Sequence, residues 1–415
     1  MLSTFTNAWK VKDIRIKLLY ILLVLLIFRI GSVIPMPGID REALNLMLIG
    51  DAGFIGMMLG GEMGTIFTMG IGPYITASII MQLMTVAVPK LEQLKKDGAE
   101  GRKKINQITR ILAVVMAVLQ AAGMVFAWRG AFAHQNIFVY IVAALTMVAG
   151  TMFIMWMSEL LTEKGMGNGA SFIIFANILA ALPGGIYMLY GASLGSLWNV
   201  VAVVVILISF VFIVGFVVLV AEGQRKLPVQ YSKKMVGRQT FGGQSSFIPV
   251  KVNLAGVLPI IFAMSILGVF DQIRMFFPES AWLLRMSEIL SVSGPIGAPI
   301  YVVLIFFFTF FYASFSINPT EMAENLKKNG GFIPGIRPGK PTGDFIQRTV
   351  NRMSWVGATA YASIAIMPIV LEWIFGVPVG FGGTTIIIVV GVALELVKKM
   401  ESQLLMRNYK GFLAS

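Results

Sequence analysis

The chain of 415 residues has no cysteine and one histidine, and charged residues make up only 13% of it. Without cysteine it cannot build a disulfide framework, a catalytic thiolate or a thiolate metal site. The single histidine, His134, lies beside Gln135 in a short predicted loop and cannot assemble a zinc cluster. A hydrophobic share of 57% excludes a disordered chain. What the sequence does contain is long apolar runs and an excess of positive charge.

The apolar runs predict membrane-spanning helices, because a helix needs about 20 mostly apolar residues to cross the hydrocarbon core. The longest charge-free run covers 165–221, and we expect Pro-Gly-Gly at 183–185 and the Gly/Ser cluster at 191–196 to divide it. The first run has a basic flank like a signal peptide, but no cleavage site follows and Arg29 interrupts it, which favours a permanent span. We predict ten spans, at about 18–34, 70–88, 110–128, 137–160, 170–189, 200–221, 255–271, 300–317, 353–374 and 380–397.

The distribution of charge predicts the orientation of these spans. With a cytoplasmic N-terminus, 28 of the 33 basic residues fall on cytoplasmic segments and only four fall outside. Arg29 is the remaining basic residue, and it lies within the first span. Basic residues favour the cytoplasmic side of a membrane protein. We therefore expect both termini in the cytoplasm, with most of the net charge of +13 on cytoplasmic segments.

The polar residues that enzymes and carriers need are scarce. The glycine-rich segment at 165–169 lacks the Gly-Lys-Ser/Thr ending of a phosphate loop, and no carboxylate lies near the middle of a span. We therefore expect no enzyme activity and no cofactor. Two alternatives stay open: a solute carrier predicts saturable transport by the purified chain, and an intramembrane enzyme predicts an activity lost on replacing His134.

An internal repeat is indicated at the start of two spans. GIGPYITA at 70–77 opens the second span and GVLPIIFA at 256–263 opens the seventh. The copies are five spans apart, and an odd number of spans inverts the second copy in the membrane. Inverted repeats commonly enclose a central pathway, although Gly-x-x-Pro at a helix start is not rare, since proline is favoured in a first turn.

Several longer motifs occur in a fixed order along the chain. They include GPYITASII at 72–80, GAEGRKK at 98–104, GNG at 167–169 and FGGT at 381–384. Two long basic loops carry further motifs: EGQRK at 222–226, QSSFIPVKVN at 244–253, NPTE at 318–321, ENLKKNG at 324–330 and IPGIRPG at 333–339. Together they resemble the SecY family of protein-export channels from residue 35 to about residue 409.

The resemblance implies an all-α polytopic membrane protein, with ten transmembrane helices in two inverted five-helix halves around a central pore. The halves are 1–190, with a plug at about 54–68, and 191–415, with the loops 222–253 and 318–352. The implied function is a protein-conducting channel of the bacterial plasma membrane, which passes unfolded secretory polypeptides and releases hydrophobic segments sideways between the second and seventh spans. The implied partners are the SecE and SecG subunits, the SecA motor ATPase, the ribosome, signal peptides, nascent polypeptides and membrane lipids.

The same resemblance assigns residues to a pore ring and a plug. The pore ring consists of Ile71, Ile75, Ala170, Ile174, Ile261 and Ile388, with Ala170 smaller than the aliphatic residue the family has there. A narrow apolar constriction dewets and blocks ions. Without the resemblance, each isoleucine would be interpreted as a residue that faces lipid or packs in the helix core. The plug comprises Phe54, Ile55, Met58, Leu59 and Ile66. Without the resemblance this segment would be interpreted as a surface loop.

The basic loops are predicted to bind the motor or the ribosome. The resemblance points to Arg337 at the tip of the second loop, and the first loop offers Arg225, Lys226, Lys233, Lys234 and Arg238. Such side chains can contact ribosomal RNA phosphates. Topology alone explains the sign of the charge. It does not explain loops of more than 30 residues, one of which has a rigid Pro-Gly turn.

Overall fold

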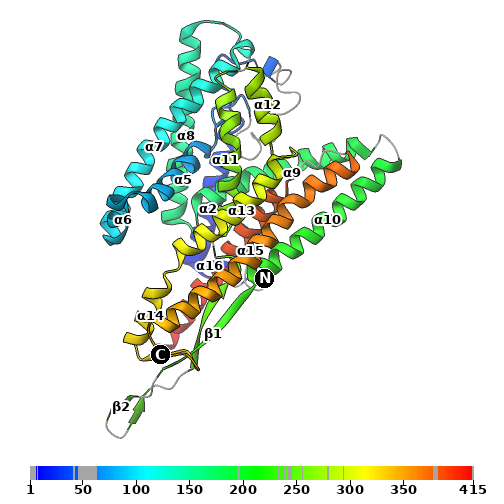
Figure 1. The fold of residues 1–415 in the computed structure, drawn as a ribbon. Helices are drawn as coiled ribbons and strands as arrows, with labels where there is room; N and C mark the ends of the chain where they lie inside the picture. Colours follow the sequence, from blue (N-terminus) through cyan, green and yellow to red (C-terminus); the bar gives the residue numbers. More distant parts are fainter. Residues whose placement is uncertain are drawn as a thin grey trace. The chain divides into compact units, whose positions relative to one another are not determined.

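The computed structural model describes residues 6, 8–40, 43–44, 63–193, 197–231, 234–236, 239–241, 245–254, 256–277, 280–292, 294–376 and 382–413. Ten helices lie over the ten predicted spans (Figure 1). In chain order they are α2 (Lys12–Gly31), α5 (Gly72–Ala87), α7 (Gly98–Ala127), α8 (Ile137–Lys164), α9 (Gly169–Ser193), α10 (Leu197–Glu222), α11 (Leu258–Arg274), α13 (Gly297–Ser316), α15 (Lys340–Phe375) and α16 (Gly383–Leu413).

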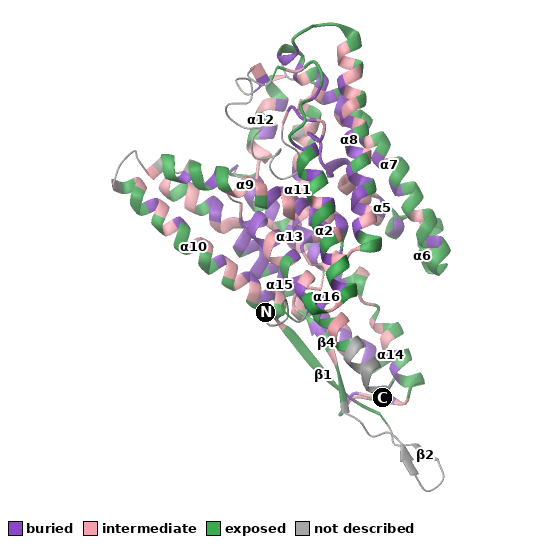
Figure 2. Ribbon diagram, turned by 180° about the vertical axis from the view of Figure 1, so that it is seen from behind, coloured by how far each residue is buried: buried purple, intermediate pink, exposed green. Residues whose placement is uncertain are grey.

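Length and composition alone qualify six helices of the described chain to cross a bilayer, namely α7, α8, α9, α10, α13 and α15. A seventh span is formed if α5 and the short α6 (Pro89–Lys96), which meet at a bend of 98°, are counted together. Apolar side chains such as Ile208, Val211 and Phe212 of α10 are exposed, and Figure 2 shows exposed positions along much of this helix. An exposed apolar surface of this extent suits lipid rather than water.

The prediction that Pro-Gly-Gly at 183–185 helps to divide the charge-free run is wrong. Helix α9 continues through Pro183, Gly184 and Gly185, and ends only at Ser193. Proline is tolerated inside membrane helices because neighbouring groups and local adjustments satisfy the backbone carbonyl that it leaves free. The fifth helix therefore ends at Ser193 and the sixth begins at Leu197.

The two copies of the predicted repeat share a local structure. Gly70 and Gly256 both have positive φ angles, of 53° and 64°. Each lies two residues before its helix, α5 or α11, and a proline occupies the second helical position in both. Glycine adopts this left-handed conformation without the steric cost that a side chain imposes. The backbone hydrogen bonds Ile75 N to Ile71 O and Ile261 N to Val257 O also correspond.

The chain divides into two compact units. One comprises Met1–Met188, Gly268–Ile289 and Val392–Ser415, and the other comprises Leu189–Leu267 and Leu290–Gly391. A core of the first unit lies between α7 and α8, where Ala117, Ala121 and Ala143 are fully buried beside Met147. Small residues at such positions let two membrane helices approach closely. The halves predicted from the repeat, 1–190 and 191–415, stay a prediction.

The second unit contains a small sheet that the sequence analysis does not predict. Strand β1 (Gln224–Tyr231) pairs antiparallel with β4 (Ser245–Lys251) on one side and with β5 (Gly331–Phe332) on the other. Strands β2 (Lys234–Val236) and β3 (Gln239–Phe241) form a separate hairpin. The two long basic loops are thus joined, because β5 belongs to the second loop and β1 and β4 to the first.

Short helices also flank the spanning ones, in addition to the 3₁₀ turn η1 (Arg129–Ala131). Helix α6 follows α5, α12 (Ala281–Leu290) connects α11 to α13, and α14 (Pro319–Lys328) opens the second basic loop. The side chain of Asn318 accepts a hydrogen bond from the Glu321 backbone N–H and so caps α14. Glu321 in the first turn and Lys327 and Lys328 in the last turn oppose the helix dipole.

Candidate functional site

The loop platform, as we call β1, β4, β5, α14, the turn at 333–339 and the first turns of α15, has its own apolar core. Leu227 and Val229 alternate with exposed residues along β1 and are buried. They belong to one cluster with the following buried residues: Val250, Ala313, Leu326, Ile333, Ile346 and Val350. Figure 1 shows β1 and α14 close to the start of α15. The two loops therefore form one structure by sharing a core with the ends of α13 and α15.

Arg337 occupies a tightly held turn of this platform. Gly335 and Gly339 on either side have positive φ angles of 81° and 99°. The buried hydroxyl of Thr342 donates a hydrogen bond of 2.9 Å to the backbone carbonyl of Arg337, while Ile333 anchors the turn in the platform core. The backbone of Arg337 is thus fixed, and the residue itself is exposed.

The basic residues of the first loop are only partly described. Arg225 and Lys226 are exposed on β1, and the Lys226 ammonium lies 4.8 Å from the ring centre of Phe247 on β4. Such a cation–π contact holds a lysine in place while leaving its charge exposed. Lys234 begins β2, and Lys233 and Arg238 lie outside the described residues.

The six predicted pore-ring residues lie at the starts of four helices. Ile71 caps α5 and Ile75 lies one turn further along; Ala170 and Ile174 have the same spacing and are the second and sixth residues of α9. Ile261 and Ile388 lie within the first two turns of α11 and α16. The first four residues belong to one compact unit and the last two to the other. Ile71, Ile174 and Ile388 are buried, and the other three are half-buried.

The start of α9, which carries Ala170 and Ile174, is tied to the end of α8. The Gly169 backbone N–H donates to the Thr162 hydroxyl at 2.8 Å, and that hydroxyl donates to the Ser158 carbonyl. A side chain at position 169 would collide with this carbonyl. The side chain of Asn168 accepts a further bond from the Ala170 N–H. Two orphan N–H groups of the helix start are thereby satisfied.

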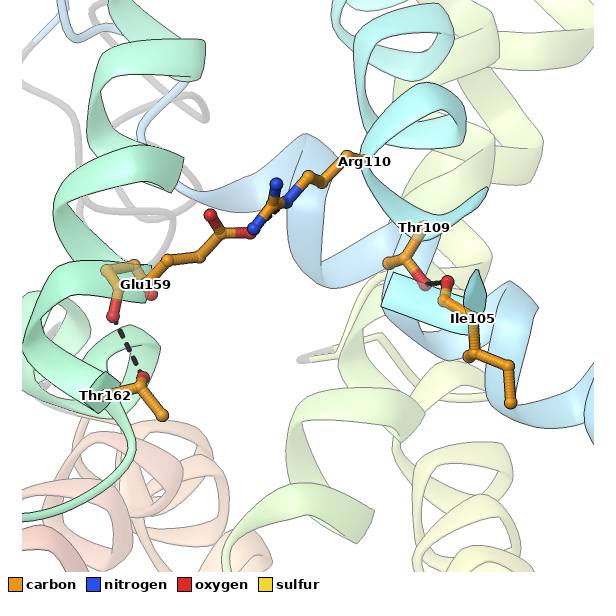
Figure 3. Close-up of polar contacts among 6 residues, drawn as sticks. Ile105, Thr109, Arg110, Glu159 and Thr162 are labelled. Atoms are coloured by element: carbon orange, nitrogen blue, oxygen red, sulfur yellow. Dashed lines mark hydrogen bonds and ion pairs between the residues drawn. The ribbon is translucent and has the colours of Figure 1, made fainter. Parts of the chain in front are cut away.

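An ion pair joins α7 to α8 one turn from this connection (Figure 3). Arg110 Nε lies 2.6 Å from Glu159 Oε1, and the two residues are 49 positions apart in the chain. Figure 3 also shows the hydroxyl bonds of Thr109 and Thr162 to carbonyls of their own helices. Tyr74 of α5 lies close enough for the charges of Arg110 and Glu159 to act on its hydroxyl group. Tyr74 also packs with residues of α7 and α8, so the ion pair lies where three helices meet.

The predicted plug is described only at its end. Phe54, Ile55, Met58 and Leu59 lie outside the described residues, whereas the Ile66 N–H donates to the Ile34 carbonyl at 3.1 Å. The next residue, Phe67, is only 3% exposed. Its ring stacks on Phe28 of α2, 5.9 Å away, and on Phe153 of α8, 6.0 Å away.

Two glycines make room for this segment. A side chain at Gly31 would collide with the Phe67 ring, and one at Gly150 would collide with the Ile66 carbonyl. Segment 65–68 therefore lies between α2 and α8 because both helices lack a Cβ at the point of contact. The sequence holds a signal for this arrangement in Gly31 and Gly150, but nothing in it reveals which segment they face.

Helix α11, the seventh predicted span, contacts α7 within the first unit. The side-chain amide of Gln120 donates to the Gln272 side-chain carbonyl at 3.2 Å. Three residues further along α7, Gly123 accommodates the ring of Phe276. These two contacts, a polar bond and an aromatic packing contact, hold the C-terminal part of α11 against α7.

The fold and these features define a polytopic helical membrane protein with apolar side chains at helix starts and a basic loop platform. A family model for SecY matches residues 65–397. The chain is 42% identical over the full length of both chains to the protein translocase subunit SecY of Halalkalibacterium halodurans. It therefore belongs to the SecY family, and the resemblance seen in the motifs is confirmed.

Solved structures show the same fold at low sequence identity. A protein-conducting channel aligns with a TM-score of 0.65 at 19% identity, covering 94% of this chain and 91% of that one. The Ssh1 complex of yeast, bound to the yeast 80S ribosome, aligns with a TM-score of 0.65 at 16% identity, covering 92% and 89%. The prediction of a helical polytopic membrane protein is confirmed.

Proposed function

We propose that the chain is a protein-conducting channel, through which unfolded secretory polypeptides cross the bacterial plasma membrane. The observation that carries this proposal is the full-length match to protein translocase subunits, made by a chain with the fold of known channels. Both termini are cytoplasmic in this proposal, as the distribution of basic residues requires. The chain itself is not an enzyme, and force comes from a partner or from the membrane potential.

In the proposed mechanism the pore ring seals the resting channel. Five isoleucines and Ala170, each near a helix start, close an apolar constriction that excludes hydrated ions. The same side chains make no specific hydrogen bond to a passing chain, so the ring tolerates any sequence. The plug at about 54–68 closes the pore from the outside, with the segment around Phe67 as its attachment to α2 and α8.

Hydrophobic segments leave through a lateral gate between α5 and α11. The two helices carry the matched Gly-x-x-Pro starts, so they are equivalent elements of the two inverted halves. Opening of the gate requires α11 to separate from its neighbours. The Gln120–Gln272 bond and the Phe276 contact support this assignment, because weak contacts of this kind cost little to break.

The loop platform is the proposed docking surface for partners in the cytoplasm. Arg337, Arg225, Lys226, Lys233, Lys234 and Arg238 supply the positive charge for a motor ATPase or for ribosomal RNA. The rigid turn that presents Arg337 and the fold shared with a ribosome-bound complex support this role. The SecE and SecG subunits, SecA, signal peptides, nascent chains and membrane lipids complete the proposed set of partners.

A reconstitution experiment tests the proposal. The chain, co-expressed with a SecE-like subunit, is placed in proteoliposomes with the SecA motor, ATP and an unfolded secretory precursor. We expect the precursor to become protected from added protease. A cysteine pair introduced across α5 and α11 is expected to block membrane insertion of a hydrophobic segment once it is crosslinked, and native cysteine is absent from the sequence. Protease-sensitive precursor in every condition would refute the channel, and insertion unaffected by the crosslink would refute the gate.

A further inference from the structure

Helix α12, in the predicted external connection between α11 and α13, presents a large exposed aromatic side chain. Trp282 is 63% exposed there. Trp128, Trp198 and Trp373 instead lie next to or near the ends of α7, α10 and α15. The predicted topology puts these ends on the same side of the membrane as the end of α11. Tryptophan is enriched at this level of a bilayer because its ring is amphipathic. Trp282 is also a tryptophan, but it lies in the connection between α11 and α13 and not at the end of a spanning helix.

The exposed apolar side of α11 continues into the segment before α12. Val269 and Ile273 are exposed at a spacing of one turn, and Phe277, four residues further on, is 60% exposed. The N–H groups of Phe276 and Phe277 donate to the carbonyls of Ile273 and Arg274, which prolongs the helical path. Phe276 is less exposed, at 37%, and part of its ring packs on Gly123, so Phe277 is the more exposed extension of the apolar stripe.

A hydrogen bond holds α12 at the level where α11 ends. Arg274 Nη1, in the last turn of α11, donates to the Ser287 hydroxyl at 3.1 Å, and that hydroxyl donates to the Leu284 carbonyl. Leu283 and Ser287 form the buried side of α12. Trp282 and Arg285 are on its exposed side. The connection is therefore folded back onto the end of α11 instead of extending away from the membrane.

We propose that α12 lies in the headgroup region of the outer leaflet, with Trp282 and Phe277 inserted at the boundary of the acyl chains. The occupant of this exposed face is the phospholipid bilayer, because the face continues the lipid-facing stripe of α11 without a break. Helix α12 carries one basic and one acidic residue, Arg285 and Glu288, so its attachment needs no anionic lipid. In this arrangement the outer end of α11 is anchored to the leaflet, and it is this helix that the proposed gate moves.

Spin labels measure the depth of α12 directly. The purified full-length chain, with Ala281→Cys labelled by a nitroxide, is reconstituted in phosphatidylcholine vesicles with and without phosphatidylglycerol. Collisions with oxygen and with a nickel chelate give the depth of the label. His134→Cys in an external loop and Ile208→Cys on the exposed face of α10 provide matched water and lipid standards.

We expect the label at position 281 to lie within about 5–10 Å of the headgroup–acyl boundary in both vesicle types. Adding Trp282→Ala is expected to shift it towards the nickel accessibility of the His134→Cys standard, and Trp282→Phe to leave it in place. Gel filtration checks that each variant is folded. Nickel accessibility at position 281 equal to that at position 134 would overturn the proposal. So would protection from both reagents, which indicates a protein partner, or a depth that depends on phosphatidylglycerol.

Discussion

Replacement of Phe67 by alanine tests whether the end of the predicted plug, around residues 65–68, is fixed by its aromatic contacts. Phe67 is almost fully buried between Phe28 and Phe153, with stacked rings on both sides. Removing a buried phenylalanine side chain costs about 3–5 kcal/mol. The two ring pairs contribute about 0.5–1.5 kcal/mol each within that loss. The site also borders an open groove of about 570 Å³ lined by Ile30, Gly31 and Gly150 among others, so its walls can relax.

We therefore expect Phe67→Ala to lower the free energy of unfolding by about 3 kcal/mol, at the low end of the range for such truncations. If the proposed plug closes the pore, loosening this attachment should also raise the resting ion conductance. Thermal unfolding in detergent and conductance in planar bilayers measure the two effects. Phe67→Leu keeps most of the side-chain volume, so it should change both the free energy of unfolding and the conductance much less than Phe67→Ala does.

Phe138→Ala provides the matched control for this experiment. Phe138 is on α8, as Phe153 is, but it is exposed and makes no buried contact. Its loss should leave both unfolding and conductance unchanged. If Phe67→Ala behaves in the same way as Phe138→Ala, the aromatic stack does not hold the segment and the reasoning fails.

Three further predictions concern the pore ring, the loop platform and the α7–α8 pair. Replacing Ile75 and Ile261 by asparagine should wet the constriction, raise resting ion leak and relax the selection of signal sequences; unchanged conductance in planar bilayers would reject the ring. Arg337→Glu should impair motor-driven export without disturbing the purified complex, because the turn is held through its backbone, and normal export would reject the docking assignment. The Arg110–Glu159 pair, with side chains 51% and 27% exposed, should show a coupling of about 0.2–1 kcal/mol in a double-mutant cycle of thermal stability. A variant with the two charges exchanged should recover part of the stability that the single substitutions remove. A coupling of zero would show that the contact is incidental.

The positions of the spanning helices could be predicted because they depend on local composition. A run of about 20 apolar residues can satisfy its backbone in lipid only as a helix, whatever surrounds it. The starts of α5 and α11 were predictable for the same reason, since Gly-x-x-Pro sets a turn and a first helical turn locally. Pro183 shows the limit of local rules, because its effect depends on what neighbours the helix.

The loop platform could not be predicted in this way. Strands β1 and β5 are about 100 residues apart in the chain, and the polar sequence of both loops gives no strong strand pattern. Their pairing is decided by Leu227, Val229 and Ile333, which are buried only when the two loops meet. The sequence motifs marked Arg337 as functional, but the hydrogen bond from Thr342 that fixes its turn is a property of the folded loop.

The sequence by itself determined that this chain spans a membrane, how its charge is divided and which family it resembles. Each of these properties rests on composition or on short contiguous motifs. Only the tertiary structure decided that Gly31 and Gly150 admit segment 65–68, that Arg110 meets Glu159, and that α12 folds back onto α11. These contacts join residues distant in the chain, and close packing selects them by shape and distance that no local pattern encodes.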